Sequence, residues 1–268
     1  MKSVKKFIES LEVVVVTGGS SGIGEAFIEE IYALKKSILF FNLSRRQPSI
    51  TLPDLNLHSI DCDLAAPLAI EEAASQIKAV VKHTKNTGPL LLINNAGFAS
   101  YGSFYDVKLS EQLEMVNVNI RACVHLTGLL LPLIKEQGGV IGNVASLTSF
   151  QATPYMATYA ASKAFLLNWS LALDAELKPL GIRSFALCPG PTKTAFFQRA
   201  SCAINPASSW MQDNSATGVV RQLLKGMAYQ KQITVPGWQN RLAACLVALL
   251  PKTLASKIAG WSLKQFRP

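Results

Sequence analysis

Hydrophobic residues along the chain form short consecutive runs that alternate with longer segments in which apolar positions recur every three or four residues. The short runs are rich in β-branched residues and too short for helices, so they are typical of buried strands. We predict about seven strands, over residues 13–16, 38–43, 57–60, 90–93, 140–144, 184–187 and 232–235.

The longer segments have the spacing of helices that bury one face. Proline near the first turn of one of them is a typical helix start. We predict helices over residues 25–36, 67–82, 110–134, 157–177 and 216–229.

The alternation of strands and helices predicts an α/β fold with right-handed parallel crossovers, hence a doubly wound parallel sheet with helices on both faces. The strands are continuously apolar, as expected when both faces of a sheet are covered. Between Arg46 and Leu57 there is no room for a full helix, and Pro48 and Pro53 argue further against one. We therefore expect that crossover to be an abbreviated loop.

No linker or repeat divides the chain, so we expect a single domain over residues 1–268. We expect residues 195–215 to form a loop long enough to act as a substrate lid. We also expect extra C-terminal helices over residues 239–268, with an apolar stretch at 242–250 and a break at Pro251. Packing over the substrate pocket or at a subunit interface is favoured for these helices over contact with a membrane surface.

Composition narrows the class of protein. No run of about 18 uninterrupted apolar residues is present, which argues against a spanning helix. The basic start is interrupted by Glu9 and Glu12, so we expect a cytoplasmic protein without a cleaved leader. The five cysteines are scattered without a C-x-x-C pair, which indicates neither disulfides nor a metal site. We expect the basic residues behind the net charge of +9 to lie on a solvated surface. No run of basic residues interleaved with aromatics marks a nucleic-acid groove.

A glycine-rich turn lies between the first strand and the first predicted helix. Its sequence is Thr17-Gly18-Gly19-Ser20-Ser21-Gly22-Ile23-Gly24. Glycine lets the backbone approach a pyrophosphate closely, and the helix N-terminus beyond it offers free N–H donors. This context predicts a dinucleotide site.

The end of the second strand indicates which dinucleotide is bound. An acidic residue there would bind the adenosine ribose hydroxyls, but the sequence offers Ser44, Arg45 and Arg46. Arginine suits a 2′-phosphate because it presents a planar fork of donors, so NADP(H) is preferred and NAD(H) remains the alternative. After the third strand, Asp63 and Leu64 are placed to meet the adenine.

Four polar residues form a candidate catalytic set. Tyr159 and Lys163 are four residues apart on one helix and therefore share a face. A nearby ammonium would lower the pKa of a tyrosine, which could then exchange a proton with a carbonyl or alcohol. Ser146 would hydrogen-bond the substrate oxygen, and Asn119 would hold water and relay protons to Lys163.

These motifs, in this order and spacing, resemble the ordinary-length branch of the short-chain dehydrogenase/reductase family. The resemblance implies a Rossmann-type fold, an NAD(P) cofactor, and the roles just given for the catalytic set. It also implies that Lys163 binds the nicotinamide ribose. The implied contacts after the fourth and sixth strands are Asn95, Ala96, Gly97, Pro189, Gly190, Thr192 and Thr194.

Substrate contacts are expected beyond the strand ends, where apolar and aromatic residues gather. They indicate an apolar or aromatic ketone, aldehyde or alcohol as substrate. The candidates are Gln151, Tyr155, Phe196 and Phe197, with 98–101, Leu147, Trp210 and Met211 as further candidates.

Two points stay open at this stage. The resemblance implies a homodimer or homotetramer built through helices 110–134 and 157–177. A catalytically silent NAD(P)-binding regulatory protein on the same fold is the alternative to an enzyme. Such proteins usually lose part of the catalytic set, and here all four residues are present.

Overall fold

The computed structural model describes residues 2–84, 88–196, 200 and 215–264. Seven parallel strands form one sheet in the order β3-β2-β1-β4-β5-β6-β7. This confirms the predicted doubly wound α/β architecture. The strands are β1 (Val13–Thr17), β2 (Leu39–Leu43), β3 (Leu57–Ile60), β4 (Leu90–Asn94), β5 (Gly139–Val144), β6 (Arg183–Leu187) and β7 (Ile233–Thr234).

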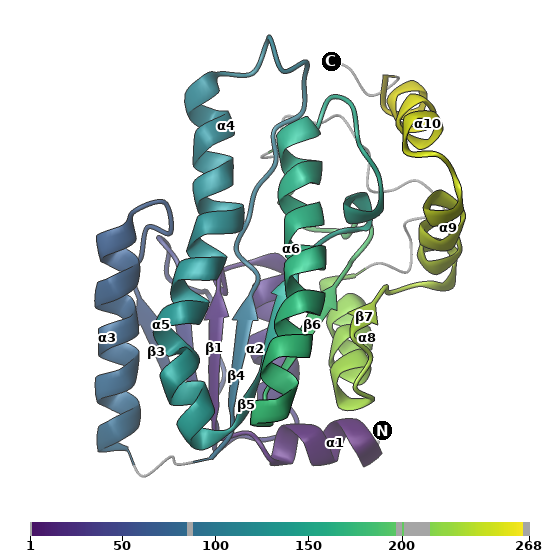
Figure 1. The fold of residues 1–268 in the computed structure, drawn as a ribbon. Coiled ribbons are helices and arrows are strands. Elements are labelled where there is room, and N and C mark those ends of the chain that lie inside the picture. The colour runs from purple at the N-terminus through teal and green to yellow at the C-terminus, as the bar shows by residue number, and fades with distance from the viewer. Residues whose placement is uncertain (1, 85–87, 197–199, 201–214, 265–268) are drawn as a thin grey trace.

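Helices cover both faces of the sheet (Figure 1). One face carries α1 (Lys2–Glu9), α2 (Gly22–Tyr32) and α8 (Ala216–Ala228), and the other carries α3, α5 and α6. The remaining helical elements are α3 (Pro67–His83), α4 (Leu109–Val116), η1 (Asn117–Arg121), α5 (Ala122–Gln137), η2 (Leu147–Phe150), α6 (Ala157–Leu177), η3 (Lys178–Leu180), α9 (Trp238–Leu249) and α10 (Lys252–Lys264).

Strand β1 shows how the sheet builds both cores. Successive side chains of a strand point to opposite faces. Val14 and Val16 therefore pack with α2 and α8, whereas Val13 and Val15 pack with α3 and α5. All four valines are fully buried. From β1 the chain builds β2 and β3 on one side of it, and it then returns to form β4 on the other side of β1. Ligands bind in the crevice that such a switch leaves at the carboxyl ends of the strands.

The structure departs from the predicted elements at a few places. Helix α2 begins at Gly22 and not at residue 25, because the end of the glycine loop already forms its first turn. Helix α1 was not expected, and it packs through the buried Ile8. The predicted helix over 110–134 contains a π-helical segment, η1, in its middle. The described segment 44–56 contains no helix, as expected for a shortened crossover.

The segment Leu109–Gln137 is long and apolar enough to cross a membrane when judged by length and composition alone. Polar and charged residues such as Glu111, Glu114 and Arg121 interrupt it, so it contains no long uninterrupted apolar run. In this fold its inner side belongs to the core beneath the sheet, where Leu126, Leu130 and Ile134 are fully buried.

A buried carboxylate joins α6 to the last two strands of the sheet. Asp174 Oδ1 accepts hydrogen bonds from Arg183 Nε at 2.7 Å and from the Ser184 backbone N–H at 2.9 Å. Its Oδ2 accepts one from Gln232 Nε2 at 2.7 Å. Burial raises the pKa of Asp174, but the hydrogen bonds from Arg183, Gln232 and Ser184 outweigh it and lower that pKa to about 2.

Replacing Asp174 with Asn should destabilise the protein by about 3 kcal/mol, because it leaves the guanidinium of Arg183 without its charged partner. Urea unfolding at pH 7 measures this loss. The stabilisation needs the ionised carboxylate, so it is present above the usual pKa of 3.8 and is lost as the pH falls toward about 2. The difference in the free energy of unfolding between the wild type and Asp174→Asn should therefore disappear over this pH range.

Glu176→Gln is the matched control, because Glu176 is an exposed carboxylate on the same helix. It should change the free energy of unfolding only slightly. Equal losses in the two variants, or a gap that stays constant down to pH 2, would contradict the role given to Asp174.

Candidate active site

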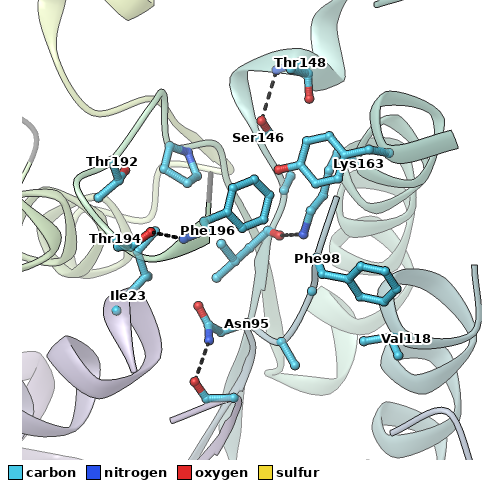
Figure 2. A pocket seen from close by; sticks show the side chains of 18 of the residues that line it. Ile23, Asn95, Phe98, Val118, Ser146, Thr148, Lys163, Thr192, Thr194 and Phe196 are labelled. Atoms are coloured by element: carbon cyan, nitrogen blue, oxygen red, sulfur yellow. Dashed lines mark hydrogen bonds between the residues drawn. The ribbon is translucent and has the colours of Figure 1, made fainter. Parts of the chain in front are cut away.

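A cavity of about 1090 Å³ lies at the carboxyl ends of the central strands. Figure 2 shows Thr192 and Thr194 on one side of it, Phe98 and Val118 on the other, and Phe196 between them. Most of the predicted site residues line this one cavity. They are Gly18, Ser20, Ser21, Gly22, Ile23, Ser44, Arg45, Arg46, Asp63, Leu64, Asn95, Ala96, Gly97, Ser146, Gln151, Tyr159, Lys163, Pro189, Gly190, Thr192, Thr194 and Phe196.

Three predicted residues are placed differently. Gly24 lies beneath the glycine loop, and Asn119 is fully buried. Tyr155 lines a smaller neighbouring cavity and is not among the residues that line the main one. Phe197 lies outside the described residues, as do Trp210, Met211 and most of the predicted lid over 195–215.

The glycine loop is held tightly against the end of β4. A Cβ on Gly24 would lie 2.3 Å from the carbonyl oxygen of Gly18, so only glycine fits there. Gly18 has a φ of +68°, a conformation that favours glycine. Asn95 fixes the loop from the other side, since its Nδ2 donates to the Thr17 carbonyl at 2.9 Å. The loop thus presents a backbone cradle to the cavity, which Gly18, Ser20, Ser21, Gly22 and Ile23 line.

A buried asparagine at the end of β2 supports the same loop. Asn42 Oδ1 accepts the Gly19 N–H at 2.8 Å, and its Nδ2 donates to Ser44 Oγ at 2.8 Å. The sequence did not predict this positioning role of Asn42. The only available signal was an amide within an otherwise apolar strand.

Arg45 and Arg46 are exposed at the rim of the cavity. The Arg45 guanidinium lies 3.7 Å from the carboxylate of Glu114, which is on α4 and also lines the cavity. On the same side of the cavity, Asp63 Oδ1 accepts the backbone N–H of Ala65 at 3.0 Å. This end of the cavity therefore offers two guanidinium groups, one of them 3.7 Å from a carboxylate, together with the backbone of the loop.

Helix α6 places Tyr159 and Lys163 in the cavity wall, as predicted. Both side chains are buried, and the Lys163 ammonium lies 5.8 Å from the centre of the Tyr159 ring. Lys163 Nζ donates a hydrogen bond to the carbonyl of Val144 at 2.7 Å. Burial lowers the pKa of Lys163 to about 8.

Tyr159 differs from the expectation that the ammonium of Lys163 lowers its pKa. Burial instead raises the pKa of Tyr159 to about 12, and a hydrogen bond with Ser146 offsets part of this rise. Desolvation is the largest cause of this shift, and the Lys163 ammonium, which donates to the Val144 carbonyl, does not offset it. In this arrangement the Tyr159 phenol keeps its proton at neutral pH.

Ser146 is held in place by its own loop. Its Oγ accepts the N–H of Thr148 at 3.2 Å, and its backbone N–H donates to Ser149 Oγ, also at 3.2 Å. Ser149 Oγ in turn donates to the carbonyl of Lys163 at 2.9 Å. Ser149 therefore joins the Ser146 loop to α6. No pattern in the sequence predicts this role.

Asn119 lies in the π-helical segment and bonds protein groups with both ends of its amide. Its Oδ1 accepts the Phe98 N–H at 3.1 Å, and its Nδ2 donates to the Phe98 carbonyl at 3.0 Å and to Ser162 Oγ at 3.1 Å. A Cβ on Gly97 would meet both Asn119 Oδ1 at 3.0 Å and Lys163 Nζ at 3.2 Å. Asn119 thus shapes the loop after β4, and its part in a proton relay stays a prediction.

Apolar groups surround Tyr159 on the substrate side. The Phe196 ring lies 5.5 Å from the Tyr159 ring at an angle of 54°. Phe196 is positioned in part by Thr194, whose Oγ1 accepts the Phe196 N–H at 3.3 Å. Tyr155, whose φ is +66°, packs against Tyr101 with ring centres 6.1 Å apart.

The two C-terminal helices complete the cavity, as expected for the C-terminal extension. Their contribution to its wall is Val247, Ile258, Ala259, Ser262 and Leu263. Asn240 of α9 lies so close to Gly190 that a Cβ on Gly190 would be 2.5 Å from Asn240 Nδ2. The hydroxyl of Tyr101 donates a hydrogen bond to the carbonyl of Leu263.

Comparison with known proteins places this geometry in a family. The model of the short chain dehydrogenase family matches residues 12–204. A ketoacyl reductase of Nostoc sp. is 33% identical over 183 residues, which are 67% of this chain and 63% of the relative. An NADPH-dependent 3-dehydrocapnine reductase of Ornithobacterium rhinotracheale is 30% identical over 231 residues, covering 83% of this chain and 78% of the relative.

Solved structures show the same fold. A short-chain dehydrogenase from Sphingobium yanoikuyae in complex with NADPH superimposes with a TM-score of 0.70 at 25% identity, covering 89% of this chain and 93% of the other. One from Burkholderia cenocepacia in complex with NADP gives 0.74 at 24% identity, covering 91% and 96%. The chain therefore belongs to the short-chain dehydrogenase/reductase family.

Proposed function

We propose that the protein is an NADP(H)-dependent oxidoreductase that interconverts an apolar or aromatic ketone or aldehyde and its alcohol, with Tyr159 as general acid and base. The observation that carries this proposal is the placement of Tyr159 and Ser146 in the wall of one cavity, beside the buried ammonium of Lys163. The glycine cradle lines the same cavity.

The residues of the cavity fit a nicotinamide dinucleotide. The cradle formed by the glycine loop suits a pyrophosphate, because backbone can approach it where a Cβ would not fit. Arg45 and Arg46 at the rim suit a 2′-phosphate. Thr192 and Lys163 would hold the nicotinamide end. Solved family members in complex with NADPH and NADP support this choice, although others are in complex with NAD.

A bound reduced nicotinamide supplies the hydride. The chain supplies orientation and a proton: Ser146 Oγ holds the carbonyl oxygen, and Tyr159 donates its proton to that oxygen as negative charge develops. A phenol that stays neutral up to about pH 12 suits this direction. The reverse oxidation needs a phenolate, which the positive charge of Lys163, 5.8 Å from the Tyr159 ring, would favour.

The apolar walls support a hydrophobic substrate. Beyond Tyr159 the cavity is lined by Phe98, Met156, Phe196 and Leu263. Pockets of this composition bind apolar molecules and orient them with a few polar groups. The relatives described above are named as reductases, one of ketoacyl substrates, which supports reduction of a ketone and not a regulatory role without turnover.

Tyr159→Phe should lower kcat for the NADPH-dependent reduction of an apolar ketone by about 1000-fold or more, because the proton donor is lost. The Kd for NADPH should stay nearly unchanged, since the ring still packs against Phe196. Single-turnover kinetics and fluorescence titration measure the two quantities. Tyr105→Phe, at an exposed tyrosine, is the control.

Undiminished turnover in Tyr159→Phe would refute the proposed proton donor. Tight NADPH binding by the wild type, with no turnover over a broad panel of carbonyls, would instead favour the regulatory alternative.

Replacing Arg45 and Arg46 together with Ala should raise the Kd for NADPH about tenfold or more and leave the Kd for NADH nearly unchanged, because only NADPH carries the 2′-phosphate. Arg221→Ala, an exposed arginine elsewhere, is the control. If both cofactors lost affinity equally, the 2′-phosphate would not be the group that these arginines bind.

The kcat/KM for NADPH-dependent reduction should fall as the pH rises through about 8, because the Lys163 ammonium of the free enzyme loses its proton there. Tyr159 cannot cause such a fall, since its pKa is about 12. Lys163→Arg keeps a positive charge, so its rate should be lower but nearly constant over the same range. A wild-type profile that is flat from pH 7 to 9.5 would contradict this assignment.

A further inference from the structure

The two C-terminal helices bury small side chains against the protein and expose large apolar ones to solvent. The residues that α9 and α10 bury against the protein are alanines, namely Ala244, Ala255 and Ala259. Their large apolar side chains face solvent, and Leu249 and Trp261 are each 82% exposed. We call the outward set the C-terminal apolar face, which consists of Trp238, Leu242, Leu246, Leu249, Leu254, Ile258 and Trp261.

Helical spacing gathers these residues into continuous strips. On α9 they recur at intervals of four, four and three residues, and on α10 at intervals of four and three. Such intervals place side chains on one side of a helix. Figure 1 shows α9 and α10 at the edge of the molecule beyond β7, away from α3. A set of large apolar side chains gathered there marks an interaction surface.

The charge around this face has one sign. The last acidic residue in the sequence is Asp213, and residues 214–268 contain eight lysines and arginines. This segment therefore carries +8 of the net charge of +9. Arg241, Lys252, Lys257 and Lys264 lie on the two helices themselves, and all four are exposed.

This combination fits an anionic lipid surface better than a second copy of the chain. A two-fold interface through the face would bring basic residues against basic residues, with no carboxylate from the segment to pair with them. Helices that lie on membranes combine Trp and Leu on one side with Lys and Arg beside them. With 12 and 13 residues, α9 and α10 are too short to span a bilayer, so they would lie along its surface.

We propose that the C-terminal apolar face docks the protein on the surface of an anionic membrane. The same helices also form part of the cavity wall. Val247 and Leu263 line the cavity, and Ile258 lines it while remaining half-exposed on the outer face. A docked molecule could therefore receive an apolar substrate directly from the lipid. This second step, unlike docking itself, rests on the proposed function.

Co-sedimentation of the full chain with vesicles tests the docking. Vesicles of phosphatidylcholine with about 30% phosphatidylglycerol should bind the protein at least about tenfold more strongly than vesicles of phosphatidylcholine alone. Added salt should weaken binding to the anionic vesicles. Binding should also shift the tryptophan emission to shorter wavelength, because Trp238 and Trp261 leave water.

Leu249→Gln combined with Trp261→Gln should weaken vesicle binding about tenfold or more, because both side chains would otherwise insert. Neither residue lines the cavity, and both are exposed, so the variant should keep its fold. Leu68→Gln combined with Tyr105→Gln is the control, since these residues are 72% and 94% exposed on other elements. Circular dichroism melting verifies folding of both variants.

Substrate delivery has its own readout. With a ketone dissolved in water, the Leu249→Gln, Trp261→Gln variant should turn over nearly as fast as the wild type. With a ketone embedded in anionic vesicles, the turnover of this variant should be about tenfold lower than that of the wild type. Vesicle binding without any turnover would overturn the proposed function and leave the docking intact.

Three results would overturn the docking. The wild type could fail to bind anionic vesicles, or the control variant could lose binding as much as the face variant. Alternatively, the face variant could change the oligomeric state in sedimentation without lipid, which would show that the face joins copies of the chain.

Discussion

The burial of the Lys163 ammonium is the constraint on which the rest of the site depends. A cation without water needs polar partners, and here the end of β5 provides the Val144 carbonyl at 2.7 Å. The loop after β4 has to approach closely, and glycine at position 97 permits this because a Cβ would contact Nζ at 3.2 Å. Parallel strands bring these loops to one edge of the sheet. The doubly wound fold therefore supplies the polar groups that stabilise a buried ammonium beside Tyr159.

Sequence reasoning recovered the features that depend on local pattern. The strands follow from apolar runs, the glycine loop from its place between strand and helix, and the Tyr159–Lys163 pair from helical spacing. It could not recover features that depend on the third dimension. The π-helical turn at Asn119 leaves no mark in the period of the sequence. The Tyr159 pKa was expected to shift downward, because the spacing reveals a neighbouring charge but not the desolvation of the phenol.

The C-terminal helices show a related limit. Their sequences are apolar with interspersed lysines, which is compatible with a pocket cap, a subunit interface or a membrane surface. The fold shows that alanines face inward and that Leu249 and Trp261 face outward, a distinction that composition cannot make. The cap and the exposed surface are therefore two sides of one structure, and the wall of the cavity is also the part of the molecule that is best suited to meet lipid.

The central claim is that hydride passes from a nicotinamide to a carbonyl carbon beside Tyr159. Transfer of deuterium from NADPH labelled at the reactive C4 position tests it most directly, with a panel of apolar ketones and the product alcohols analysed by mass spectrometry. The account predicts that one deuterium appears on the carbinol carbon of at least one product, with a slower single turnover than unlabelled NADPH gives. Binding of labelled NADPH without deuterium in any alcohol would contradict it.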